Sequence, residues 1–160
     1  MAEQARAATF DDLKHLARAL ADAGADYLLV GAYALAAHGY VRATIDIDLL
    51  VPRSAQAGAR LKQALLTLPD RVAEALDPAW FTEGDNIRVA DAFVVDLLLS
   101  ANGHSFEDLQ PHEQRIDLDG VPVRTIDLDG LLLTKQTTRE QDVADRIAIE
   151  RALAALRGKP

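Results

Sequence analysis

Polar and hydrophobic residues alternate from Thr44 to Val51, and the rest of the sequence is best understood around this segment. Successive side chains of a strand point to opposite faces, so Thr44, Asp46 and Asp48 share one face and the aliphatic residues share the other. The pattern therefore predicts a strand that carries two neighbouring carboxylates on one side and packs into a core on the other.

A second pattern lies immediately upstream. The run Leu28–Val30 is apolar throughout and ends at Gly31, which is typical of a short buried strand that stops at a turn. The alanine-rich stretch from Ala32 to His38 favours a short helix, and Gly39 is suited to end it. We expect a strand, a glycine turn, a helix and then the acidic strand.

Cap residues and helical periodicity predict the other elements. Thr9, Ser54 and Asp127 are suitable N-caps, and Asp119-Gly120 is a two-residue hairpin signal. The predicted helices cover 10–23, 55–66, 128–136 and 140–156, and the predicted strands cover 86–89, 93–99, 114–118 and 121–126. This order predicts an α/β (α+β) fold, in which helices flank one mixed β-sheet.

The final predicted helix has an apolar face that we expect to point into the core. Its members are spaced at helical intervals: Val143, Ile147, Ala148, Ala152, Leu153 and Leu156. Trp80 and Phe81 are expected at the edge of the same core.

The composition is that of a globular protein. A chain of 160 residues with 49% apolar content is expected to form a single domain over residues 9–158, preceded by a loose tail at 1–8. Without cysteine it has no disulfides or thiolate metal sites, which is compatible with a cytoplasmic location. We expect no signal peptide and no membrane association, since no apolar run is long enough. The net charge of −8 disfavours non-specific binding to nucleic acid.

The two neighbouring carboxylates are the first candidates for chemistry. Asp46 and Asp48 repel each other, so they need a proton, a cationic partner or a metal ion. Arg42 could serve as the partner, and the same residue could instead contact a phosphate, as could Thr44. The alternative for the two acids is an edge strand whose carboxylates face water.

A third acid, Asp96, lies within the apolar run Phe93–Leu99, where a lone charge is costly to bury. It could be satisfied by an arginine or by backbone amides. If its strand lies beside the first acidic strand, three carboxylates converge. Three acids without cysteine suit magnesium or manganese better than structural zinc.

Two further features have open interpretations. Gly31 is either an ordinary tight turn or a place where a phosphate approaches backbone amides. Lys135 is either a snorkelling side chain or an amine that points into the cleft. Arg139, Asp142 and Asp145 are spaced at i, i+3 and could simply form an ion-pair ladder on one helix.

Three sequence words together resemble the nucleotidyltransferase superfamily that includes DNA polymerase beta: GAYALAAHG, RATIDIDLLV and REQDVAD. They are most similar to its small bacterial members, the AbiEii-like proteins and the minimal nucleotidyltransferases of toxin–antitoxin systems. The resemblance covers about residues 25–155. It implies a nucleotidyltransferase-like domain.

The resemblance also implies roles for individual residues. Gly31 and Ala32 match the turn that holds the triphosphate. Asp46 and Asp48 match the pair that binds two Mg²⁺ ions, for which Mn²⁺ is a substitute. Asp96 matches the third acid, which helps to bind the metal and accepts a proton.

Two later residues, Lys135 and Asp142, match positions near the nucleotide in AbiEii-like relatives. The sequence departs from the family pattern at two places: Ala32 stands where glycine or serine is usual, and Gln141 where lysine is usual. Ala32 lacks the hydroxyl that would contact a phosphate.

The expected function is magnesium-dependent transfer of a nucleoside monophosphate from a nucleoside triphosphate to an acceptor. The acceptor is RNA, a protein or a small molecule, and the setting is a toxin–antitoxin system. The main alternative is a catalytically weak or inactive partner or antitoxin module with the same fold. A weaker one is an enzyme that modifies antibiotics such as aminoglycosides.

Overall fold

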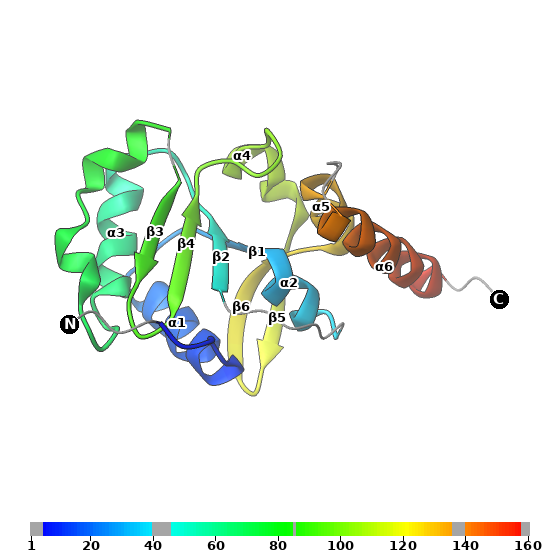
Figure 1. Cartoon of the computed structure of the whole chain (residues 1–160), viewed down its shortest axis with the longest axis horizontal. Helices are drawn as coiled ribbons and strands as arrows, with labels where there is room; N and C mark the ends of the chain where they lie inside the picture. The colour runs from blue at the N-terminus through cyan, green and yellow to red at the C-terminus, as the bar shows by residue number, and fades with distance from the viewer. Residues whose placement is uncertain (1–4, 40–45, 85, 136–139, 158–160) are drawn as a thin grey trace.

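A computed structural model describes residues 5–39, 46–84, 86–135 and 140–157. Its centre is a six-stranded sheet in the order β3-β4-β2-β1-β6-β5 (Figure 1). The strands are β1 (Leu28–Val30), β2 (Asp46–Leu50), β3 (Ile87–Ala90), β4 (Val94–Leu98), β5 (Glu113–Leu118) and β6 (Val121–Ile126).

The helices lie around this sheet. The α-helices are α1 (Phe10–Asp22), α2 (Gly31–Ala37), α3 (Ala55–Leu65), α4 (Phe106–Leu109), α5 (Leu128–Thr134) and α6 (Glu140–Leu156). Three short 3₁₀ turns cover Val72–Ala75, Pro78–Thr82 and Gln110–His112. The mixed α/β domain expected from the sequence is confirmed.

The sheet is mixed because its two hairpins are joined through parallel pairs. The strand β2 pairs antiparallel with β1 and parallel with β4, and β1 pairs parallel with β6. The hairpins β3–β4 and β5–β6 form the two sides of the sheet. The two innermost strands, β1 and β2, are consecutive in the sequence, and each pairs on its other side with a strand of a later hairpin.

Local capping determines where the longer helices begin. The Thr9 hydroxyl accepts a hydrogen bond from the backbone of Asp12, whose carboxylate accepts one from the backbone of Thr9, so α1 begins with a capping box. The Ser54 hydroxyl caps α3 in the simpler way, and the Asp127 carboxylate caps α5. All three predicted N-caps are confirmed.

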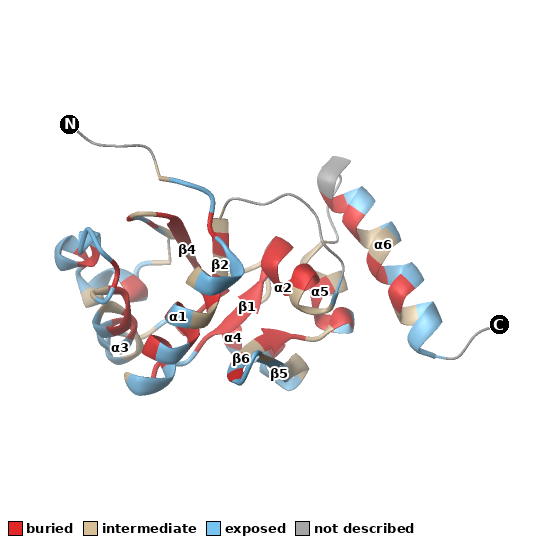
Figure 2. Cartoon of the chain, turned by 90° about the horizontal axis from the view of Figure 1, so that it is seen from below, coloured by how far each residue is buried: buried red, intermediate tan, exposed pale blue. Residues whose placement is uncertain are grey.

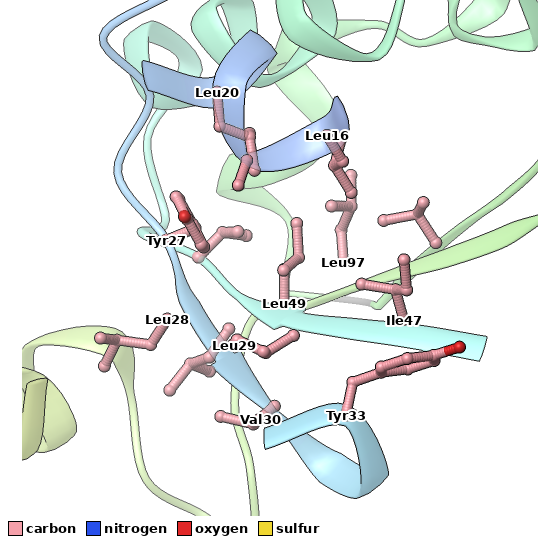
Figure 3. Packing of buried hydrophobic residues seen from close by; sticks show 14 of the residues in the cluster. Leu16, Leu20, Tyr27, Leu28, Leu29, Val30, Tyr33, Ile47, Leu49 and Leu97 are labelled. Carbon is pink, nitrogen blue, oxygen red and sulfur yellow. The ribbon is translucent and has the colours of Figure 1, made fainter. Parts of the chain in front are cut away.

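The hydrophobic core lies between the sheet and α1. Leu49 on β2 pairs with Leu97 on β4, and both side chains are fully buried. Figure 3 shows Leu16 and Leu20 of α1 on the same side of the sheet as Leu49. Because side chains alternate along β2, its two aspartates point to the opposite side, toward α2 and α5.

The rotation of α6 differs from the sequence prediction. Val143, Ile147 and Leu156 are exposed, whereas Ile149 and Ala152 are buried. The buried face of α6 also carries two acids, Asp142 and Asp145, and these bind Lys135 at the end of α5. Figure 2 shows α6 extending away from the sheet with buried and exposed residues along its length. Ala152 is buried as predicted and Leu153 packs against the core, but three of the predicted residues are exposed and Ile149 was not predicted, so hydrophobic periodicity indicated the buried face only in part.

Three smaller predictions have mixed outcomes. Phe81 is buried as expected, but Trp80 is 42% exposed. The start of the acidic strand, with Arg42 and Thr44, lies outside the described residues. In the described part of the expected tail, Arg6 donates a backbone hydrogen bond to Ala92, and Ala8 is buried.

No helix among the described residues has the length and apolar character needed to cross a membrane.

Candidate active site

Two of the candidate acids are direct neighbours across the sheet. Asp48 on β2 is the register partner of Asp96 on β4, in a parallel pair. Asp46 lies two residues before Asp48 and therefore projects from the same face. The sequence alone made this convergence conditional on the two strands being adjacent, and the structure meets that condition.

The glycine turn after β1 is fitted closely around Asp48. Val30 is the register partner of Asp48, and the next residue, Gly31, has a φ of 71°, which side chains rarely adopt. A Cβ atom at Gly31 would lie 2.4 Å from an Asp48 carboxylate oxygen. The turn thus requires glycine twice, for its backbone conformation and for the space that Asp48 occupies.

Burial and mutual repulsion raise the pKa values of two of the acids. Burial raises the pKa of Asp48 from 3.8 to about 7, and the negative charges of Asp96 and Asp46 add to this effect. The charge of Lys135 acts in the opposite direction on the same carboxyl. Burial, followed by the charge of Asp96, also raises the pKa of Asp46, which Arg88 partly offsets.

Arg88 on β3 is the cation that contacts two of the acids. Its Nε lies 3.0 Å from Asp96 Oδ1, and its Nη2 lies 3.3 Å from Asp96 Oδ2 and 3.2 Å from Asp46 Oδ2. The sequence analysis had missed Arg88 and considered Arg42, which lies outside the described residues. Arg88 is the register partner of Asp96 in the predicted hairpin, so hairpin pairing was the signal that could have found it.

A second group of charges forms where α5 ends and α6 begins. Lys135 Nζ lies 3.4 Å from Asp142 Oδ1 and 3.1 Å from Asp145 Oδ2. All three side chains are largely buried, with Lys135 only 12% exposed. The snorkelling alternative for Lys135 is therefore wrong. Asp142 and Asp145 each pair with Lys135, which follows the preceding helix, and Arg139 lies outside the described residues, so the predicted ladder stays a prediction.

A cleft of about 370 Å³ connects the two groups of charges. Five of the residues predicted for the site line it: Gly31, Asp48, Asp96, Lys135 and Asp142. These residues come from four separate segments of the sequence.

The other predicted residues lie differently. Asp46 is not among the lining residues and reaches the site through its contact with Arg88. The Ala32 side chain is buried within α2. Arg42 and Thr44 lie outside the described residues, so their predicted phosphate contacts stay predictions.

The far wall of the cleft contains polar residues that the sequence analysis did not assign to the site. They are Asn86, which precedes β3, and Ser100 and Asn102, which follow β4. The Asn86 side-chain oxygen accepts a hydrogen bond from Leu99, and the Asn102 amide donates one to Leu133. Asn102 and Gly103 form a turn, and nothing in the sequence indicated that this turn lies beside a cleft.

A preformed metal centre is not present in the described part of the chain, because no three His, Cys, Asp or Glu side chains there have a suitable arrangement. Asp46, Asp48 and Asp96 nevertheless supply the oxygen ligands and negative charge that hard divalent cations require. In the structure Arg88 provides the positive charge for two of these three acids.

One solved structure resembles this architecture along nearly the whole chain. It is the crystal structure of a protein from Thermotoga maritima described as a "putative nucleotidyltransferase". The alignment covers 93% of this chain and 90% of that one, with a TM-score of 0.55 and 13% sequence identity. The fold is nucleotidyltransferase-like.

Sequence comparison adds no family assignment for this nucleotidyltransferase-like chain. No protein-family model matches it, and no curated protein does. At 13% identity the structural likeness establishes the fold alone, so the chemistry has to be argued from the residues of the cleft.

Proposed function

We propose that this protein transfers a nucleoside monophosphate from a nucleoside triphosphate to an acceptor and that the reaction requires Mg²⁺. The observation that carries the proposal is the pairing of Asp48 with Asp96 on adjacent strands, next to the Gly31 turn, within a nucleotidyltransferase-like fold. Phosphoryl transfer relies mainly on positioning and charge neutralisation, and both require acids and cations gathered around one cleft.

The three acids fit a divalent cation in their chemistry. Carboxylate oxygens are the preferred ligands of Mg²⁺ and Mn²⁺. The pKa of Asp48 is raised first by burial and then by the negative charges of Asp96 and Asp46, which a bound cation would offset. Asp46, Asp48 and Asp96 would hold two Mg²⁺ ions, which would neutralise charge on the phosphates.

The chain's own residues would carry the remaining tasks. In this proposal the Asp96 carboxylate accepts the proton of the attacking hydroxyl or amine. Lys135 lies on the wall of the same cleft and supplies positive charge toward the phosphates. Gly31 lines the cleft, and in this proposal the phosphates meet the backbone of its turn.

The subtype and acceptor are finer parts of the proposal. The words GAYALAAHG, RATIDIDLLV and REQDVAD favour the small AbiEii-like bacterial type. On that basis we propose RNA or a protein as acceptor, a role in a toxin–antitoxin system and a cytoplasmic location.

The test is transfer from labelled ATP, CTP, GTP and UTP to total RNA and protein, with Mg²⁺ or with EDTA. Asp48→Asn and Asp96→Asn are each expected to reduce transfer at least about a hundredfold, because each removes charge from the reacting centre. The matched control is Asp117→Asn, which changes an exposed aspartate on β5 at the opposite edge of the sheet.

Full transfer by either site variant would refute the catalytic assignment. Absence of transfer and of Mg²⁺-dependent nucleotide binding in the wild-type protein would favour the alternative, in which the fold serves only as a partner or antitoxin module.

A further inference from the structure

Arg88 occupies oxygen atoms that the proposed metal site would need. Its guanidinium contacts both carboxylate oxygens of Asp96 and one of Asp46, at 3.0–3.3 Å. A guanidinium and a divalent cation cannot both approach these oxygens closely, because they would repel each other. Arginine and metal are therefore competitors for Asp46 and Asp96.

The position of Arg88 allows its side chain to move away from Asp46 and Asp96. Its side chain is 62% exposed, and it lies on β3, which is the edge strand of the sheet. Exposed ion pairs contribute little free energy, since water and salt screen them and long side chains lose freedom in forming them. A rotation of the arginine side chain into solvent would free the acids without a change in the backbone.

Asp48 differs from the other two acids in its contacts. Among the described residues no arginine pairs with it, and its carboxyl lies against Gly31 in the cleft. Asp48 is therefore the acid of the three that Arg88 does not hold, and a cation bound there gains the other two only when Arg88 releases them.

We propose that Arg88 is a positioning residue that holds Asp46 and Asp96 in the cation-free protein and sets the divalent-cation concentration at which the site fills. The inference rests on the proposed function, because it assumes that these acids bind the metal. It assigns to Arg88 a regulatory role: the acids stay ordered and charge-balanced until a divalent cation displaces the guanidinium.

The experiment measures Mn²⁺ binding by calorimetry and by the loss of the free-Mn²⁺ electron paramagnetic resonance signal. The wild-type protein is compared with Arg88→Gln and with Arg157→Gln, an exposed arginine that pairs with Asp129 outside the site. Arg88→Gln is expected to bind Mn²⁺ about tenfold more tightly than Arg157→Gln, because the competing cation is gone. The control corrects for the loss of one positive charge from an acidic protein.

Two further measurements separate competition from a structural role. Arg88→Lys keeps the charge but loses the paired geometry, so its Mn²⁺ affinity is expected between those of wild type and Arg88→Gln. In EDTA, Arg88→Gln is expected to melt at a lower temperature than wild type and to gain more from saturating Mn²⁺.

The outcomes distinguish this inference from the function on which it rests. If Asp48→Asn weakens Mn²⁺ binding but Arg88→Gln binds no more tightly than Arg157→Gln, the inference is overturned and the proposed metal site remains. If neither wild type nor Arg88→Gln binds Mn²⁺ at millimolar concentration, both proposals fail.

Discussion

Two groups of carboxylates lie at the cleft, and each is balanced by a cation in a different way. Arg88 on an edge strand covers Asp46 and Asp96, with most of its side chain in water. Lys135 is 12% exposed and lies between Asp142 and Asp145, which are almost fully buried. The first arrangement can be opened by a side-chain rotation, whereas the second requires the helices to separate.

This difference divides the site into an adjustable part and a fixed part. Burying an ion pair costs desolvation, and removing one partner leaves a charge without compensation. The Lys135 group is therefore expected to fix the position and rotation of α6. The Arg88 group is expected to contribute less to the fold, and its acids become available when the arginine side chain turns away.

The largest expected effect comes from breaking the fixed group. Lys135→Met leaves Asp142 and Asp145 buried without their lysine, and we expect it to lower the free energy of unfolding by about 3–5 kcal/mol. Urea denaturation followed by circular dichroism measures the change. The control Arg157→Gln is expected to stay within about 0.5 kcal/mol of wild type. A loss below about 1 kcal/mol for Lys135→Met would show that the two groups do not differ as described.

The rotation of α6 can be tested with two isoleucines that lie two positions apart. Ile149 is fully buried and Ile147 is 47% exposed. Ile149→Ala is expected to lower the free energy of unfolding by about 3 kcal/mol, through lost burial and a cavity. Ile147→Ala should change it by no more than about 0.5 kcal/mol. The reverse order, measured in urea, would support the face predicted from periodicity.

Stability should depend on pH through Asp48, which lies between the two groups. Its pKa of about 7 in the folded protein exceeds the ordinary 3.8, so the folded state binds the proton more tightly. The contribution of Asp48 is therefore most favourable below about pH 4 and is lost as the pH rises to about 7. In EDTA at pH 8, Asp48→Asn is expected to be about 2 kcal/mol more stable than wild type, and the two should be similar at pH 4. Parallel pH profiles for the two proteins would contradict this expectation.

A smaller effect is expected where the Gly31 turn meets Asp48. Gly31→Ala places a methyl group against the carboxylate and strains the backbone, with an expected loss of about 2 kcal/mol. Gly120 also has a positive φ, 87° against 71° for Gly31, but no atom lies within 4 Å of the added Cβ, so Gly120→Ala isolates the backbone contribution. Equal losses in thermal unfolding for the two variants would mean that Asp48 moves aside without cost.

Elements with local signals were predicted well from the sequence. Thr9 and Ser54 cap α1 and α3 as expected, α6 begins and ends at the predicted residues, and Asp119-Gly120 joins β5 to β6. Caps and tight turns depend on a few adjacent residues, so their physical causes lie within one short segment.

Non-local pairings were harder to predict. The strand order of the sheet places β2 beside β4. From the sequence, the convergence of the three acids could only be stated on the condition that these strands are adjacent. Arg88 was missed because its role depends on hairpin register, and the buried face of α6 was only partly predicted because Lys135 binds acids there. Both the role of Arg88 and the buried face of α6 depend on charged side chains that lie on another element.

The register of the β3–β4 hairpin has a consequence for how this site changes by mutation. Arg88 faces the acids because the loop between the strands has the length that sets it opposite Asp96. One inserted residue in that loop would shift the pairing by one position and send the arginine to the far side of the sheet, with Val89 in its place. Insertions and deletions in this loop can therefore remove the counter-charge of the cleft even when every residue of the site is retained.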